Sequence, residues 1–147
     1  MKKSLIPILL VVFTFAHTFA SGQCTECESL EEALKDPQRV KSLIVNPFLG
    51  GAEMDTILPD IGQLKNLETL FLTDQSFTTI PPEIGQLKNL KEISFSGSPI
   101  SELPEEFFEI KSPAEIILFN TAMTDEYQEA FKKKALERWP DVKVLID

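Results

Sequence analysis

The sequence of 147 residues has only one histidine, His17, and this residue lies in an apolar segment at the amino terminus. If that segment is removed as a signal peptide, the remaining chain has no histidine. Such a chain cannot form a Ser-His-Asp or Cys-His catalytic site, or a metal site with a histidine ligand. The missing histidine thus excludes the enzyme classes that depend on this residue, and we expect neither a metal nor another cofactor.

Basic residues are also scarce, with 14 Lys and Arg against 23 Asp and Glu and a net charge of -9. Removal of Lys2 and Lys3 with the amino-terminal segment leaves 12 basic residues against the same 23 acidic ones, a net charge of -11. A surface this acidic repels the phosphate groups of nucleic acids and disfavours adsorption to anionic lipids. We expect no nucleic acid partner, and a protein or peptide ligand is favoured if it is basic.

The chain has only two cysteines, Cys24 and Cys27, which follow the apolar segment directly. In an exported protein such a C-x-x-C pair is typical of a short local disulfide. A redox-active pair would need its first cysteine at a helix start inside a βαβ unit, and the surrounding sequence predicts none. Lipid attachment at Cys24 is a third alternative, although Gln23 stands where a small residue is expected.

The first 20 residues have the organisation of a secretory signal peptide. Lys2 and Lys3 precede an apolar core over residues 5–15, and Ala20 ends a stretch suited to cleavage. An uncleaved membrane anchor is the alternative, but the strongly apolar part is short for a span. We therefore expect a secreted, periplasmic or cell-envelope protein, with contact to a membrane only if the signal is retained or Cys24 is lipidated.

What the sequence does contain is a seven-residue phrase, IGQLKNL, that occurs at residues 61–67 and again at 84–90, 23 positions later. The same shift aligns apolar residues on both sides of the phrase. A further copy follows, and an earlier one fits if four additional residues are allowed between Val45 and Met54. A repeat of this length predicts a solenoid, in which coils that cannot bury their apolar residues alone stack on one another.

The spacing within one repeat predicts the shape of a coil. Leu70 and Leu72 alternate with outward-facing residues, as a short strand with one buried face requires. Pro81 and Pro82 lack backbone N–H groups and therefore predict an irregular or helical return segment rather than a strand.

At these residues the chain resembles the leucine-rich repeat family, in the class with the consensus LxxLxLxxNxLxxLPxxIxxLxx. The resemblance covers residues 40–123 and implies an α/β solenoid with about four parallel strands. In one column the chain departs from the family, because the usual Asn is replaced by Gln75, Ser98 and Thr121. These side chains still form hydrogen bonds but with a different reach, so we expect an irregular ladder in this column.

The repeat divides the chain into a signal peptide (1–20), an amino-terminal segment with a capping helix (21–39), the repeats (40–123) and a carboxyl-terminal cap (124–147). Ser29 and Glu32 predict a capping box at the start of a helix over residues 30–35. A second helix is expected from Asp125, with Ala130 on its packed side. A strand over 142–146 should follow and pair with the strand at 116–119, and Trp139 is expected to pack within this cap.

The four additional residues fall in the segment 46–53, which contains Phe48, Leu49 and two glycines. Phe48 and Leu49 are too apolar for an ordinary loop. We expect them to pack against the amino-terminal cap, and an exposed contact for a partner is the alternative.

Alternation in the repeat strands leaves a second set of side chains on the outer, concave face of the sheet. Its middle column is mostly apolar, and rows of large exposed apolar residues usually mark a contact surface. The resemblance implies that this face binds a protein or peptide, so a non-enzymatic binding module is the expected function. The candidate binding residues are Ile44, Thr69, Phe71, Thr73, Glu92, Ser94, Glu115, Ile117 and Phe119.

Two other functions compete with this one. A lipid on Cys24 would make the chain a surface-anchored scaffold or spacer. Glu92 and Glu115, adjacent on the outer face, are the carboxylate pair that a histidine-free hydrolase would need. A short solenoid offers only a shallow surface, which disfavours the hydrolase.

Export generates the first testable prediction. Amino-terminal sequencing of the native protein should begin near Ser21, because a signal peptidase would cleave after Ala20. An intact Met1 on native protein from a cytoplasmic fraction would contradict export.

Overall fold

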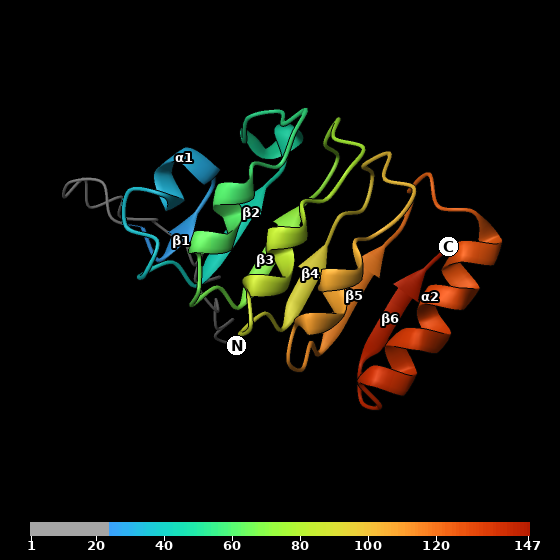
Figure 1. Ribbon diagram of the computed structural model, residues 1–147. Helices are drawn as coiled ribbons and strands as arrows, with labels where there is room; N and C mark the ends of the chain where they lie inside the picture. Colours follow the sequence, from blue (N-terminus) through green and yellow to red (C-terminus); the bar gives the residue numbers. More distant parts are fainter. Residues whose placement is uncertain (1–23) are drawn as a thin grey trace, which may run out of the picture.

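A computed structural model describes residues 24–147 (Figure 1). The predicted signal peptide, with His17, lies outside the described residues. Within residues 24–147, no helix combines the length and apolar character needed to cross a membrane.

The strands are β1 (Glu26–Cys27), β2 (Ser42–Val45), β3 (Thr69–Leu72), β4 (Glu92–Ser94), β5 (Glu115–Leu118) and β6 (Lys143–Ile146). The helices are α1 (Leu30–Ala33), α2 (Asp125–Arg138) and the 3-10 helices η1 (Pro47–Leu49), η2 (Pro59–Gln63), η3 (Pro82–Gln86) and η4 (Glu105–Glu109).

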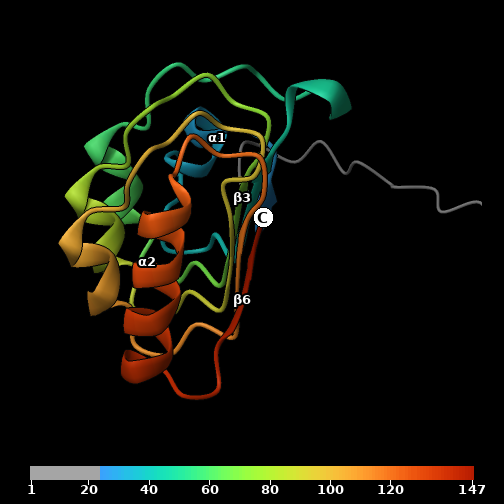
Figure 2. The same ribbon diagram turned by 90° about the vertical axis from the view of Figure 1, so that its right-hand side faces the viewer.

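All six strands form one parallel sheet in the order in which they occur in the chain. Figure 2 shows this sheet nearly edge-on, with η2, η3, η4 and α2 on one side and no helix over most of the other face. Inward-facing strand residues such as Leu70, Leu72 and Ile93 meet residues of the return segments, such as Ile84 and Leu87, in one continuous core. The predicted α/β solenoid is therefore correct.

The predicted number of about four strands is too low. β6 is the closing strand that the sequence predicted, and it pairs with β5 with Ile116 opposite Val144. β1 was not predicted. Its two residues pair with Ser42 and Leu43 of β2 and extend the sheet beyond the first repeat.

The repeated phrase IGQLKNL is the part of each coil that docks onto its neighbours. Its apolar residues are buried, and its asparagines join the coils through hydrogen bonds to the preceding coil. The side chain of Asn66 donates to the carbonyl of Gln38, and that of Asn89 donates to the carbonyl of Lys65, both at 2.8 Å. The phrase is thus repeated because each copy makes the same contact.

The glycine of the phrase allows the return segments to approach one another. A Cβ atom at Gly85 would lie 2.2 Å from the backbone carbonyl oxygen of Glu106 in the next coil. At Gly62 a Cβ atom would meet the side chains of Gln86 and Glu83 at 3.0 Å. The approach at Gly85 is therefore limited by backbone, whereas at Gly62 it is limited by side chains.

The column that departs from the family forms an irregular ladder, as predicted. The buried side chain of Gln75 accepts a hydrogen bond from the N–H of Met54 (2.7 Å) and donates to the carbonyl of Val45 (3.1 Å). Ser98 accepts a bond from the N–H of Gln75 (3.2 Å). The buried hydroxyl of Thr121 has no hydrogen-bond partner among the described residues.

The turns that follow the strands contain a second regular column. Asp74, Gly97 and Asn120 lie 23 residues apart and have positive φ angles of 56°, 76° and 51°. The N–H of Asp74 donates to the carbonyl of Ser96 (2.8 Å), and that of Gly97 donates to the carbonyl of Phe119 (2.9 Å). The left-handed residue thus turns its N–H toward the next coil and continues the ladder beyond the strand.

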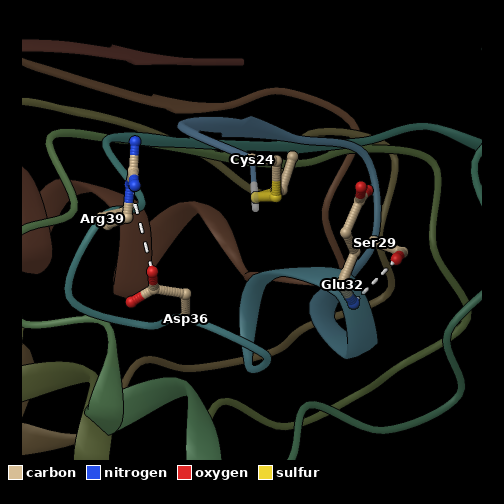
Figure 3. Close-up of a disulfide and its surroundings, with 6 residues drawn as sticks. Cys24, Ser29, Glu32, Asp36 and Arg39 are labelled. Carbon is tan, nitrogen blue, oxygen red and sulfur yellow. Dashed lines mark hydrogen bonds and ion pairs between the residues drawn. A yellow bond between two sulfur atoms is a disulfide. The ribbon is translucent and has the colours of Figure 1, made fainter. Parts of the chain in front are cut away.

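The amino-terminal cap is held by a disulfide and a short helix (Figure 3). Cys24 and Cys27 form the disulfide, and Cys27 is buried in the core. The hydroxyl of Ser29 accepts a hydrogen bond from the N–H of Glu32 (3.2 Å), so Ser29 caps α1 as predicted. α1 ends at Ala33, earlier than the predicted residue 35.

The carboxyl-terminal cap is aromatic. Trp139 is buried, packs on Phe108 with a centroid distance of 5.5 Å, and donates from its indole nitrogen to the carbonyl of Ile110 (3.0 Å). Its predicted packing role is confirmed. The prediction for Ala130 was wrong, because Ala130 is exposed. Gln128, two residues earlier, is buried instead, and its side chain donates to the backbone carbonyl of Met123.

The stacking contact at Gly85 generates a stability prediction. Gly85→Ala should lower the free energy of unfolding by about 1–3 kcal/mol, because the neighbouring backbone must move to admit the methyl group. Chemical denaturation measures this change. The matched control is Gly62→Ala, which should change stability by less than about 1 kcal/mol, since side chains can rearrange and alanine restricts the unfolded chain. Equal losses in the two variants would contradict the backbone contact.

Candidate functional site

The side of the sheet that carries no 3-10 helix is the candidate site, and we call it the open face. In-register pairing places outward-facing side chains of successive strands opposite one another. It brings together seven of the nine residues that the sequence predicted for this face, and the other two, Thr73 and Phe119, directly follow β3 and β5. The row across the middle consists of Ile44, Phe71, Ser94, Ile117 and Leu145.

Four of the five side chains in the middle row are apolar and at least partly accessible. The side chain of Ile44 is 42% exposed, and those of Phe71 and Ile117 are half-buried. Phe119, just beyond β5, is 37% exposed. Ser94 was expected to be accessible, but it is only 4% exposed, because a small side chain between the larger Phe71 and Ile117 is shielded by them.

Polar and charged residues occupy the amino-terminal ends of β3 to β6. Thr69, Glu92, Glu115 and Lys143 lie opposite one another in that order. Lys143 forms an ion pair of 2.5 Å with Glu115, while Glu92 is exposed and 3.5 Å from the hydroxyl of Thr69. One flank of the apolar row is thus polar and contains an exposed carboxylate.

A second charged group lies at the residues that immediately precede β2, β3 and β4. The Glu68 carboxylate is 2.5 Å from the ammonium of Lys91 and 3.0 Å from that of Lys41. Hydrogen bonds from Lys91 and then Lys41, together with their charges, lower the pKa of Glu68 from 4.5 to about 2. This cluster ties three successive coils together at the edge of the open face.

The opposite flank of the apolar row is also polar. The side-chain amide of Asn46 donates to the hydroxyl of Thr73 (2.7 Å) and to the carboxylate of Asp74 (2.9 Å). Ser96 accepts a hydrogen bond from the N–H of Phe119 (3.1 Å). These bonds fix the strand exits, so the open face has an apolar centre with polar margins on both sides.

The expectation that Phe48 and Leu49 pack against the amino-terminal cap was wrong. They lie in η1 and are 84% and 81% exposed, more than any other large apolar residue among those described. We call residues 46–51 the η1 turn. The exposure of Phe48 and Leu49 agrees with the alternative interpretation, in which they form an exposed contact for a partner.

The arrangement provides little for catalysis. Glu92 and Glu115 are opposite one another, as predicted, but Glu115 is paired with Lys143 and both side chains lie on an open surface. Among residues 24–147, no group of three or more His, Cys, Asp or Glu residues could hold a metal ion.

The ion cluster generates a pH prediction. The folded-state pKa of Glu68, about 2, lies below its ordinary value of 4.5, so ionised Glu68 stabilises the fold above about pH 4.5. That contribution is lost as the pH falls from 4.5 toward 2. An NMR titration should find the Glu68 carboxyl midpoint near 2 in the native chain. In a Lys41→Met, Lys91→Met variant the midpoint should rise toward 4.5, and a native midpoint already at 4.5 would contradict the cluster.

Comparison with solved structures agrees with the architecture. The fold is similar to that of a leucine-rich repeat protein from Leptospira interrogans, with a TM-score of 0.65 and 23% sequence identity. The similarity covers 81% of this chain but 28% of that protein. No protein-family model matches the sequence, and no curated protein is similar to it. The chain thus has a leucine-rich-repeat-like fold, and this comparison carries no further information on function.

Proposed function

We propose that the chain is a non-enzymatic module that binds a protein or peptide through the open face of its sheet. The observation that carries the proposal is that Ile44, Phe71 and Ile117 of the middle row, together with Phe119 just beyond β5, are apolar and at least partly exposed. None of them is part of the buried core. Apolar residues kept in register on a solvated surface usually mark a contact with another molecule.

The margins of this row fit the same function. Glu92 and Glu115 lie on one side and Asn46 and Thr73 on the other, so the apolar centre has a polar rim. Protein interfaces commonly have this organisation, and an aromatic residue such as Phe71 at the centre is a typical energetic anchor.

The ligand that we propose is basic. The chain without its predicted signal peptide carries a net charge of -11, and Glu92 is an exposed carboxylate on the flank of the row. Opposite charge on a partner accelerates encounter and fixes orientation, whereas like charge opposes binding.

We further propose that the protein acts outside the cytoplasm, in the secreted or envelope fraction. The amino-terminal sequence supports export, and the Cys24–Cys27 disulfide supports it independently, since disulfides persist in oxidising compartments. A lipid-anchored spacer would need the same Cys24 sulfur that forms the disulfide, so mass analysis of the mature amino terminus distinguishes the two.

The binding proposal predicts the effect of a double substitution on the open face. Phe71→Ala with Ile117→Ala should fold normally and should weaken the complex by about 2 kcal/mol or more, roughly 30-fold in Kd. The measurement is calorimetric titration with the partner purified from the native envelope or secreted fraction.

The matched control is Leu58→Ala with Leu136→Ala, which removes apolar residues of 49% and 43% exposure elsewhere on the surface. This control should bind like the native chain. Unchanged affinity of a folded Phe71→Ala, Ile117→Ala variant would exclude the open face as the binding site.

A further inference from the structure

The η1 turn interrupts the repeat and holds two apolar side chains in water. Phe48 and Leu49 are 84% and 81% exposed, whereas the two most exposed apolar residues of the open face, Ile44 and Phe119, are 42% and 37% exposed. Figure 2 shows this turn projecting past the sheet on the side of the open face. It follows β2 directly, and Asn46 at its start bonds Thr73 of the face, so the turn and the face form one continuous surface.

The conformation of the η1 turn is fixed by hydrogen bonds rather than by packing. The side chain of Asn46 accepts a bond from the N–H of Phe48 (2.8 Å). The carbonyl of Asn46 accepts bonds from the N–H groups of Leu49 (3.1 Å) and Gly51 (3.0 Å). The turn is therefore held from within and is tied to the neighbouring coil through Thr73.

Two further residues suit the turn to this conformation. Pro47 fixes the first backbone angle of η1, and Gly50 adopts a φ of 97° that other residues rarely take. A turn fixed in this way loses little conformational entropy when it binds. Its rigidity presents Phe48 and Leu49 to a partner at no cost to the core, because neither side chain belongs to the core.

We propose that the η1 turn is the anchor that selects the partner of this module, and that the partner is a folded protein with an apolar cavity rimmed by basic groups. This inference rests on the proposed binding function of the open face. A side chain that protrudes with four fifths of its surface exposed becomes buried only when it is surrounded on most sides. A cavity does this, whereas a flat surface or an extended peptide covers one side only.

The charges around the turn decide between a protein, a membrane and a second copy of the chain. Asp74 bonds Asn46 at 2.9 Å, and Glu53 and Asp55 are exposed in the segment that follows the turn. Segments that insert into anionic membranes carry Lys or Arg beside their apolar residues, and this one carries only acids. A second copy would bring the same net charge of -11. The surroundings therefore favour a basic protein.

Site-specific photocrosslinking tests the proposal in the full chain expressed in its native envelope. p-Benzoylphenylalanine replaces Phe48 in one variant, Phe71 in a second and Leu58 in a third. Leu58 serves as the control, because it is exposed and immediately precedes η2, which lies on the side of the sheet opposite the open face. We expect the probes at Phe48 and Phe71 to label the same protein, and the probe at Leu58 not to label it.

The labelled protein is then purified, and its affinity is measured by calorimetry. Phe48→Ser with Leu49→Ser should raise Kd by about 30-fold or more without changing the melting temperature, since both side chains are exposed. Affinity should also fall as salt is raised, because the basic rim meets an acidic surface. Vesicles of phosphatidylcholine, with or without phosphatidylglycerol, should not bind the native chain.

The outcomes separate this proposal from the function on which it rests. Labelling from Phe71 alone, or unchanged affinity of the Phe48→Ser, Leu49→Ser variant, would overturn the anchor and leave the open face as the binding site. Labelling from Phe48 alone would contradict the proposal that the open face binds the partner. It would also contradict the proposal that the open face and the η1 turn form one binding surface. Labelling of lipid or of a second copy from Phe48, or vesicle binding that the double variant loses, would overturn the protein partner.

Discussion

The close stacking of successive coils is the constraint on which the rest of the structure depends. On one side the strands pair in register, and on the other the return segments approach so closely that only glycine fits at position 85. Within this stack, the alternation of side chains along each strand determines which residues point inward. Phe71 faces outward because Leu70 and Leu72 face the core. The positions that face outward are thus set by the core, but the types of residue at these positions are free to differ from coil to coil.

The sequence predicted the repeat strands well, because a period of 23 marked by an identical phrase fixes their position and direction. β1 was missed, since two residues show no alternation and their strand conformation depends on pairing with β2. The sequence does contain a signal for the left-handed turn residues, because Asp74, Gly97 and Asn120 are residue types that tolerate positive φ and they recur at the repeat spacing. Gln75 also meets its partners only because its longer side chain reaches Met54, beyond the four-residue insertion.

For the candidate site, alternation predicted the direction of each side chain but not its accessibility. Ser94 points outward yet is buried, since accessibility depends on the size of the residues on adjacent strands. Phe48 and Leu49 were expected to be covered because they are apolar, and their exposure follows instead from backbone hydrogen bonds that hold η1 outward. Hydrophobicity alone therefore predicts which residues are buried in a regular coil, but it does not predict whether the apolar residues of an insertion are buried.

The hydrogen bonds between coils also bear on how the chain folds. Among the described residues, the side-chain hydrogen bonds between coils join residues that are 21 to 30 positions apart. The bonds of Lys41 to Glu68 and of Trp139 to Ile110 are examples. No such contact requires the two ends of the molecule to meet, and in a solenoid with contacts of this range folding can start at any coil and spread to its neighbours. The aromatic cap, in which Phe131 and Trp139 contact Phe107 and Phe108, then ends this spread at the last coil.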